Sequence, residues 1–338
     1  MKGLINITGR IVAKSSALQE VLLSFGGERY RILYYHMVNN ITPDYYFLDK
    51  GIQFDDFREQ VLNYKRKFTF IPLSEALKRL ENGKSLKRCI SVTTDDGFRE
   101  NYEFIAPFLY KENILSTFFL IDNCIDNKHL MWRNQQAYIY NKLGREKTYQ
   151  LICNAAQKFN LPTPDPKEDI FSWSKRTFDM EKKDILTSKL WQEAKMKNIQ
   201  ELLKEKKPYM TLNQIKELVS KGFEIGAHSI SHPFCDKLDY NQLKDEVLGS
   251  IRSISEKTGY PVQIFSYPFG NRASRKFEEK LIAENGSEIK ALIGIKNVLK
   301  NKNPYLLERD LQETTSDMAA FRFFILPYFR KLTPMNNE

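Results

Sequence analysis

Short apolar segments alternate with amphipathic segments along most of this 338-residue chain, and that alternation constrains the fold more than any other feature. The apolar segments are rich in β-branched and aromatic residues, as strands are, whereas the segments between them have helical periodicity. The predicted strands are residues 31–38, 68–71, 89–94, 115–121, 223–227, 262–267 and 291–295. A helix between two strands returns the chain to its starting edge, so consecutive strands run parallel. The sequence therefore predicts an α/β domain with a mostly parallel sheet.

Polar residues of the capping type mark the starts of several predicted helices. Ser74, Thr211 and Asp239 each precede a segment of helical periodicity, and we expect each to be an N-cap. Gly83 and Gly222 are placed to end two of these helices.

Residues 123–209 carry no strand signal. Lys, Glu, Gln and Asn dominate there, and large apolar residues recur at helical spacing, with a proline-rich loop at residues 161–166. We interpret the stretch as a helical insertion between two strands of the domain. An insertion beside an active site can serve as its lid or wall. Trp132 and Arg133 lie just past the end of the predicted strand 115–121, where they could form part of such a lid or wall. Alternatively, Trp132 is a hydrophobic anchor and Arg133 is solvated.

The two ends of the chain differ from the predicted domain, which spans residues 31–320. Residues 1–30 form an amphipathic segment, and we expect its apolar face to pack on the domain rather than on a membrane. That face comprises Leu4, Ile7, Ile11, Leu18, Val21 and Leu22. Arg10 and Lys14 interrupt the segment, so it is not read as a signal peptide. Residues 321–338 are aromatic and basic, and either contact a membrane surface or partner or dock on the domain.

Charge and cysteine content narrow the choice of partner and compartment. The formal net charge of +10 favours acidic partners, but Lys and Arg are dispersed among Glu and no aromatic-basic recognition motif appears, so we expect no nucleic-acid partner. The four cysteines form no CxxC pair, which favours a reducing compartment. No apolar run approaches the ~20 residues of a membrane span. We expect a cytoplasmic protein, with peripheral contact at the inner membrane as the alternative; the oligomeric state is left open.

The predicted strand 89–94 ends in two adjacent carboxylates and a glycine, Asp95, Asp96 and Gly97. Two neighbouring acids repel each other, and a core strand rarely ends in such a pair unless a cation or a shared proton is present. Glycine lets the backbone turn sharply at that point. The alternative is structural, with Asp96 as the N-cap of the helix that follows.

Two of the four histidines, His228 and His232, follow directly after another predicted strand. Histidines four residues apart share one face of a helical turn, where both rings can reach one metal ion. With Asp96 they make a three-ligand set that leaves coordination positions open, as catalytic zinc sites do, and Asp95 could then accept a proton from water. Non-haem iron oxygenases use a similar triad but need a cosubstrate site, for which we find no signal. Two metal-free surface or capping histidines are the structural alternative.

Three short motifs in this order resemble those of the polysaccharide deacetylases, the NodB-homology or carbohydrate esterase family 4 group. Residues 93–97, Thr-Thr-Asp-Asp-Gly, resemble the family's TFDDG motif, and residues 228–232 match its H-[ST]-x-x-H motif. Residues 265–270, Phe-Ser-Tyr-Pro-Phe-Gly, resemble its R-x-P-x-G motif in a looser Y-P-x-G form. The resemblance covers residues 31–121 and 211–310, and omits both ends and the insertion.

The resemblance implies a distorted (β/α)7 barrel of the NodB-homology type, with the site at the carboxyl ends of its strands. It also implies that Asp95 is the general base, and that the backbone N–H of Tyr267 helps to hold an oxyanion. The implied metal ligands are Asp96, His228 and His232. From the ligand types the metal is expected to be Zn²⁺, with Co²⁺ or Ni²⁺ able to substitute.

Two departures from the family pattern bear on the catalytic residues. The family's third motif often begins with an arginine that orients the catalytic aspartate; this chain has Ser266 there, and we expect Arg309 to substitute. The family usually has a C-terminal histidine as general acid, but no histidine follows His232. The branch resembling exopolysaccharide deacetylases of the poly-N-acetylglucosamine type takes that histidine from an early Tyr-His-x-Val strand. Residues 35–38 fit that pattern, which makes His36 the candidate general acid.

The function implied is a metal-dependent deacetylase that hydrolyses the N-acetyl group of an amino sugar in a polysaccharide or glycan precursor, during assembly of a cell-surface polysaccharide. Two alternatives stay open. The first is a carbohydrate-binding protein on the same fold with impaired catalysis, which the missing motif arginine favours. The second is a metal-dependent hydrolase of another bond, such as a phosphoester or cyclic amide.

Overall fold

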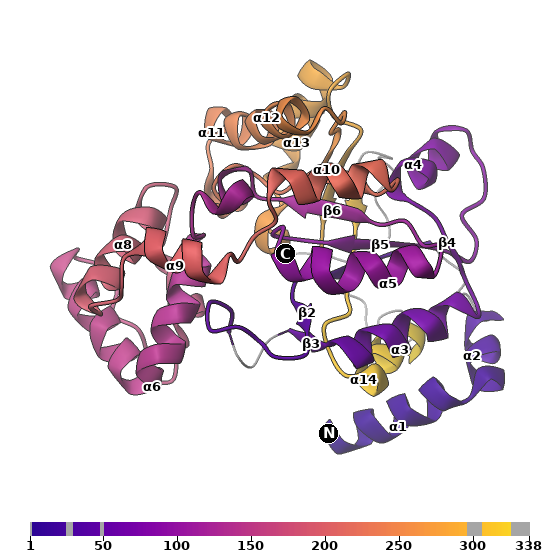
Figure 1. Ribbon diagram of the computed structural model, residues 1–338, viewed down its shortest axis with the longest axis horizontal. Coiled ribbons are helices and arrows are strands. Elements are labelled where there is room, and N and C mark those ends of the chain that lie inside the picture. Colours follow the sequence, from indigo (N-terminus) through magenta and orange to yellow (C-terminus); the bar gives the residue numbers. More distant parts are fainter. Residues whose placement is uncertain (1, 25–29, 48–50, 296–305, 326–338) are drawn as a thin grey trace.

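A nearly closed barrel of parallel strands, surrounded by helices, forms the body of the protein (Figure 1). The computed structural model describes residues 2–24, 30–47, 51–295 and 306–325. Neighbouring barrel strands are hydrogen-bonded in the order β1 (Arg31–Tyr35), β5 (Cys89–Thr94), β6 (Thr117–Leu120), β7 (Glu224–Ala227), β8 (Ile264–Ser266) and β9 (Ala291–Gly294). A short strand, β4 (Thr69–Phe70), pairs with the first half of β5 beside β6. The predicted parallel α/β architecture is confirmed.

One short segment closes the barrel. Its first part, β10 (Leu306–Glu308), pairs with β9, and its second part, β11 (Asp310–Leu311), pairs with β1. Only Arg309 separates the two parts, so a single continuous stretch joins the first and last strands. Counted as one strand, it completes the expected (β/α)7 barrel.

The barrel strands are buried on both faces, as parallel strands covered by helices must be. All six residues of β5 are buried. The surrounding helices are α3 (Phe54–Lys65), α4 (Leu73–Glu81), α5 (Ala106–Lys111), α10 (Leu212–Ser220), α11 (Tyr240–Lys244), α12 (Ser250–Thr258) and α13 (Arg275–Asn285). A π-helical turn at Asn101–Ile105 precedes α5, and another at Asp245–Gly249 joins α11 to α12.

The helix starts follow the predicted caps in two of three cases. Thr211 and Asp239 each make a capping box, with Gln214 and Gln242 respectively. The expected cap at Ser74 is wrong, because α4 begins after Pro72 and the Ser74 N–H already lies inside the helix. That N–H donates instead to the Glu224 carboxylate, 3.2 Å away.

The helical insertion forms a lobe of its own at one end of the barrel, at the left of Figure 1. It contains α6 (Trp132–Lys158), α7 (Ile170–Thr177), α8 (Lys182–Glu193) and α9 (Ile199–Lys206). Its buried side chains form a cluster separate from the barrel core, and that cluster includes Trp173, Leu186 and Leu190. A 3-10 segment, Asp122–Asn127, leads into it from β6.

The two ends of the described chain pack against each other. The first helices, α1 (Lys2–Lys14) and α2 (Ser16–Leu22), lie beside α14 (Ser316–Ala320) and a final π-helical turn, Phe321–Ile325. Gly9 permits this approach, since a Cβ there would lie 2.0 Å from the Asp317 carbonyl oxygen. The expected packing face is wrong in three of its members, because Ile7, Ile11 and Val21 are exposed.

The described part of the aromatic tail docks on the domain. Phe323 and Phe324 are buried, and the Phe323 ring stacks on Tyr64 at 4.3 Å. The remainder of the tail, residues 326–338, lies outside the described residues. Across the described ranges no helix is both long and apolar enough to cross a membrane.

Candidate active site

A sharp turn at the end of β5 directs two carboxylates into the barrel mouth. Both Asp96 and Gly97 have φ of 69°, the left-handed region that glycine adopts freely and other residues rarely do. Gly97 packs against Leu120, whose Cδ2 would lie 3.0 Å from an added Cβ. Asp95 and Asp96 are both buried. The turn therefore presents two adjacent acids at the carboxyl end of the barrel.

Asp96 faces the two histidines that follow β7. Its Oδ1 lies 3.4 Å from His228 Nε2 and 3.3 Å from His232 Nε2, and all three side chains are buried. The alternative role of Asp96 as a helix cap finds no support, since its Oδ1 accepts no hydrogen bond from the described residues. A buried carboxylate oxygen facing two imidazole nitrogens is the donor set of a three-ligand divalent-cation site. These residues therefore fit a metal ion.

The ionisation of this cluster also suits a cation. Burial opposes the charge on Asp96, but the two facing imidazoles outweigh that cost and hold the pKa of Asp96 well below its usual range. Burial lowers the pKa of His232 to about 4, despite the neighbouring Asp96. An ionised carboxylate and a neutral imidazole are the forms that coordinate metal.

The segment between the histidines is a loop and not the predicted helical turn. Ser229 and His232 have φ of 71° and 59°, and the His232 N–H donates to Ser229 Oγ at 2.9 Å. Glu246 clamps the loop from the π-helical turn Asp245–Gly249: its Oε2 accepts from Ile230 N at 2.7 Å and from Ser231 N at 3.0 Å. The two imidazole rings nevertheless meet, with centroids 5.0 Å apart.

One hydrogen bond orients the His228 ring, and another holds the backbone at His232. His228 Nδ1 hydrogen-bonds the Ser266 carbonyl oxygen at 2.7 Å, which turns Nε2 toward Asp96. On the other side, the Trp132 indole N–H donates to the His232 carbonyl oxygen at 2.8 Å. Trp132 is fully buried, so it anchors the insertion to the site.

Arg309 holds Asp95 through both carboxylate oxygens. Its Nη1 and Nη2 donate to Asp95 Oδ1 and Oδ2 at 2.7 and 2.6 Å, and Nη2 also donates to Ser266 Oγ at 2.6 Å. Burial alone would raise the pKa of Asp95, but Arg309 and His228 reverse that effect and lower it. The guanidinium reaches Asp95 from the closing segment, beside the serine that stands at the first position of the third motif.

His36 enters the site from the end of β1. Its Nε2 lies 3.9 Å from Asp95 Oδ2, and its Nδ1 lies 3.0 Å from Glu313 Oε2. Glu313 also accepts from the backbone N–H groups of His36 and Met37. Burial depresses the pKa of His36, but Glu313, with smaller contributions from Asp96 and Asp95, raises it overall to about 9. Sequence reasoning missed Glu313, since no local pattern distinguishes it from other glutamates.

The backbone N–H of Tyr267, expected to face an oxyanion, is committed elsewhere. It donates to the Ile293 carbonyl oxygen at 2.9 Å, which extends the β8–β9 pairing by one hydrogen bond. The Tyr267 ring is fully buried against Phe265. That expectation is therefore corrected: the N–H belongs to the barrel sheet.

Comparisons with known proteins show sequence similarity over part of this chain. A family profile described as polysaccharide deacetylase matches residues 177–286, which include both site histidines but neither aspartate. A Bacillus subtilis (strain 168) protein, YxkH, whose name places it among polysaccharide deacetylases, is 31% identical over 67 residues, or 20% of this chain. The matched stretch spans about a quarter of that relative's length, 24%.

Solved structures extend the likeness to most of the fold. A Streptococcus pyogenes deacetylase, PplD, in complex with acetate, has a TM-score of 0.53 at 14% identity, covering 90% of this chain and 98% of that one. IcaB from Ammonifex degensii has a TM-score of 0.54 at 16% identity, covering 88% and 96%. The resemblance to polysaccharide deacetylases is thus confirmed in sequence over residues 177–286 and in fold over most of the chain.

Proposed function

We propose that this protein is a metal-dependent deacetylase that removes the N-acetyl group from an amino sugar in a polysaccharide or glycan precursor. One observation carries the proposal: three differently specialised groups meet at one barrel mouth. These are the Asp96, His228 and His232 cluster, the Asp95–Arg309 pair, and His36 held by Glu313.

Asp96, His228 and His232 would hold the metal. Zn²⁺ is the first choice from the ligand types, with Co²⁺ or Ni²⁺ as substitutes. When bound, such a cation would act as a Lewis acid on the acetyl carbonyl and make water a stronger acid.

Asp95 is the proposed general base, and Arg309 its positioning residue. A carboxylate with a lowered pKa is ionised at neutral pH and can accept the proton of the attacking water. The two hydrogen bonds from Arg309 fix both oxygens, so the base needs no reorganisation when the proton moves. These contacts also weaken the alternative of an impaired binding protein, which the absence of the motif arginine favoured.

His36 is the proposed general acid. Hydrolysis of an amide requires a proton at the leaving nitrogen, and an imidazole with a pKa raised to about 9 is protonated at neutral pH. Glu313 fixes Nδ1, which leaves Nε2 on the side of Asp95. Base and acid thus lie on the same side of the barrel mouth, near the proposed metal site.

The test is acetate release from N-acetylglucosamine oligomers and from lipid-linked N-acetylated sugars. We expect release by the metal-loaded protein, loss with chelator, recovery on adding Zn²⁺, and a fall in kcat of at least about 10²-fold in Asp95→Asn. No release from any of these substrates by the metal-loaded protein would sink the proposal. Release of phosphate or of a ring-opened amide from other substrates would favour a hydrolase of another bond.

A further inference from the structure

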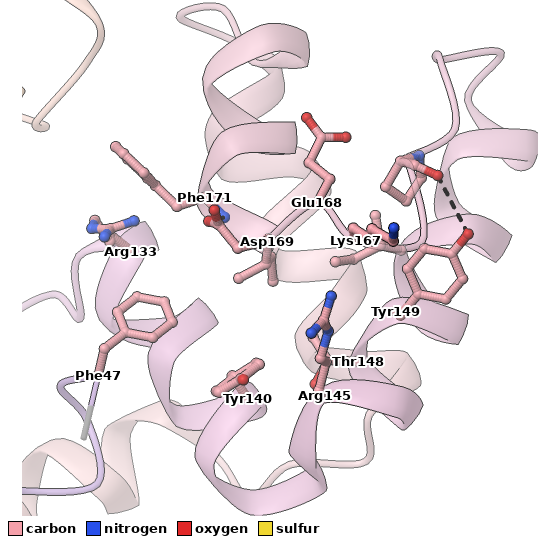
Figure 2. A pocket seen from close by; sticks show the side chains of 13 residues that line it. Phe47, Arg133, Tyr140, Arg145, Thr148, Tyr149, Lys167, Glu168, Asp169 and Phe171 are labelled. Carbon is pink, nitrogen blue, oxygen red and sulfur yellow. Dashed lines mark hydrogen bonds between the residues drawn. The ribbon is translucent and has the colours of Figure 1, made fainter. Parts of the chain in front are cut away.

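The helical insertion contains a cavity of about 320 Å³ that the proposed chemistry does not use. It lies between α6 on both sides of its bend, the proline-rich loop and the start of α7. Figure 2 shows aromatic and basic side chains around one space, among them Phe47, Arg133, Tyr140, Arg145, Tyr149 and Phe171. The volume is at the lower end of the ~300–1,000 Å³ typical of small-molecule sites.

A break in α6 shapes this cavity. Gly144 has φ of 74° and ψ of 174°, which no helix accommodates, so the helix bends there. Arg145 follows the bend and donates to the Pro166 carbonyl oxygen at 3.1 Å, while the Tyr149 hydroxyl donates to the Pro164 carbonyl oxygen at 3.3 Å. The loop is therefore tied to the helix on two sides, and the cavity is preformed.

A series of ring contacts connects the cavity to the candidate metal site. The Arg133 guanidinium lies 3.6 Å from the centre of the Phe171 ring. Phe171 packs on Phe269 with centroids 5.3 Å apart, and Phe269 packs on His232 at 4.5 Å. The cavity thus begins only a few side chains from the reacting centre, a span that successive units of one chain-like substrate could cover.

The lining suits a sugar ring. Tyr140 and Phe47, whose ring centroids are 6.0 Å apart, offer half-buried apolar faces. The nearby carboxylates are already engaged: Asp169 caps α7, and Glu168 pairs with Arg176 at 2.7 Å. The Arg145 guanidinium has N–H donors besides the one bonded to the Pro166 carbonyl oxygen. These can donate to hydroxyl or acidic oxygens alike.

We propose that this cavity is a saccharide subsite, which binds a unit of the same glycan remote from the unit that is deacetylated. The inference rests on the proposed function. It assigns the insertion a role in selecting long glycans over short ones.

The experiment compares Tyr140→Ala with Phe159→Ala in the full-length metal-loaded protein. Phe159 lies at the end of α6, is 39% exposed and does not line the cavity, so its truncation is a matched control. KM and kcat are measured with N-acetylglucosamine oligomers from the dimer to the hexamer. In the parent protein KM should fall as the oligomer lengthens. Tyr140→Ala should raise KM for the hexamer about tenfold, and leave both kcat and the KM for the dimer unchanged. Phe159→Ala should not raise KM for the hexamer.

A binding measurement separates this subsite from the chemistry. The hexamer is titrated calorimetrically into Asp95→Asn protein with and without Tyr140→Ala, and Phe47→Ala serves as a second cavity variant. Loss of affinity in both cavity variants supports the subsite even if no oligomer releases acetate, an outcome that would sink only the proposed function. KM independent of oligomer length, or hexamer binding unchanged in both cavity variants, overturns the subsite.

Discussion

Asp95 and Arg309 form a buried ion pair in which each charge depends on the other. Both side chains are almost fully buried, and the guanidinium also lies over the Tyr34 ring at 4.5 Å. Removing one partner of such a pair leaves an uncompensated buried charge, at a cost of ~3–5 kcal/mol. Arg309 therefore stabilises both the structure around Asp95 and the ionised state of that carboxylate.

Glu313 should control the alkaline limit of activity. The imidazolium of His36 is the proton-donating form, and it exists below the pKa of about 9 that Glu313 does most to maintain. Glu313→Gln removes that negative charge, so the pKa of His36 falls. The alkaline loss of activity then begins at a lower pH than in the parent protein. We expect the alkaline limb of the pH–kcat profile to move by about one unit or more toward neutrality.

The control for that experiment is His36→Gln, alone and combined with Glu313→Gln. Once the imidazole is gone, the Glu313 change should not move any remaining alkaline limb. An unchanged limb in Glu313→Gln itself would mean that another group protonates the leaving nitrogen.

At the level of single residues, local patterns reveal groups that are close in the chain, and the family resemblance points to the distant His36 and Arg309, but Glu313 carries neither signal. Asp95 and Asp96 are adjacent, and His228 and His232 are four apart, so a local pattern reveals them. Glu313 meets His36 across 277 positions, which no local pattern can signal. The sequence does not reveal the partner of the Tyr267 N–H, because sheet pairing, which is also non-local, decides where a backbone donor points.

The loop 228–232 depends on one carboxylate from a neighbouring element. Glu246 accepts two backbone N–H groups and the Ser231 hydroxyl, and it thereby sets the path between the two histidines. Glu246→Gln loses the charge-assisted part of these bonds, and we expect metal affinity to fall about 10–100-fold. Competition with a chromogenic chelator measures the change.

Glu224→Gln is the matched control for Glu246→Gln. Glu224 is also buried and also accepts a backbone N–H, from Ser74, together with the Thr117 hydroxyl. It begins β7, whereas the histidine loop follows the other end of that strand. Its substitution should lower thermal stability but leave metal affinity unchanged. An equal fall in metal affinity for both variants would show that the effect comes from general destabilisation of the fold.

At the level of elements, burial decides what the sequence reveals. The strands that are buried along their whole length, such as β5, are predicted to within a few residues because both faces are covered. The sequence does not predict a strand in the closing segment 306–311, Leu-Leu-Glu-Arg-Asp-Leu, because charged residues occupy half of it. Its side chains are tolerated there through specific partners, as Arg272 pairs with Glu308 at 3.0 Å, and partners of that kind become visible only in the assembled barrel.

Metal binding should stabilise the whole molecule, because its three proposed ligands come from two different strand ends. A ligand that binds only the folded state at about 100 times its Kd contributes ~2.7 kcal/mol. We expect added Zn²⁺ to raise the Tm of chelator-treated protein by several degrees, as measured by scanning calorimetry. His232→Ala should lose most of the increase.

His129→Ala is the control for that increase, since His129 is the one histidine outside the site and is exposed in the described structure. It should keep the full shift. An identical shift in His232→Ala and in the parent protein would place the stabilising ion elsewhere.

At the level of the whole molecule, the sequence together with the family resemblance was sufficient to predict the architecture. Alternation of strands and helices predicts a mostly parallel α/β sheet, and the family resemblance implies that the sheet is a barrel. How the insertion packs on the barrel is harder to predict, because it depends on which polar group accepts the Trp132 indole N–H. Here that group is the His232 carbonyl oxygen. The packing of α1 was likewise hidden, since a glycine at position 9 gives no apolar signal.

The barrel's closing segment also imposes an order of events during protein synthesis. A ribosome delivers the chain from its N-terminus, so Asp95 and the two loop histidines leave it long before residues 306–313. Those last residues bring Arg309 to Asp95 and Glu313 to His36 in the same step that joins β9 to β1. A chain that has not yet reached residue 306 therefore lacks the partners of both Asp95 and His36. The proposed base and the proposed acid therefore gain their partners together, when the barrel closes.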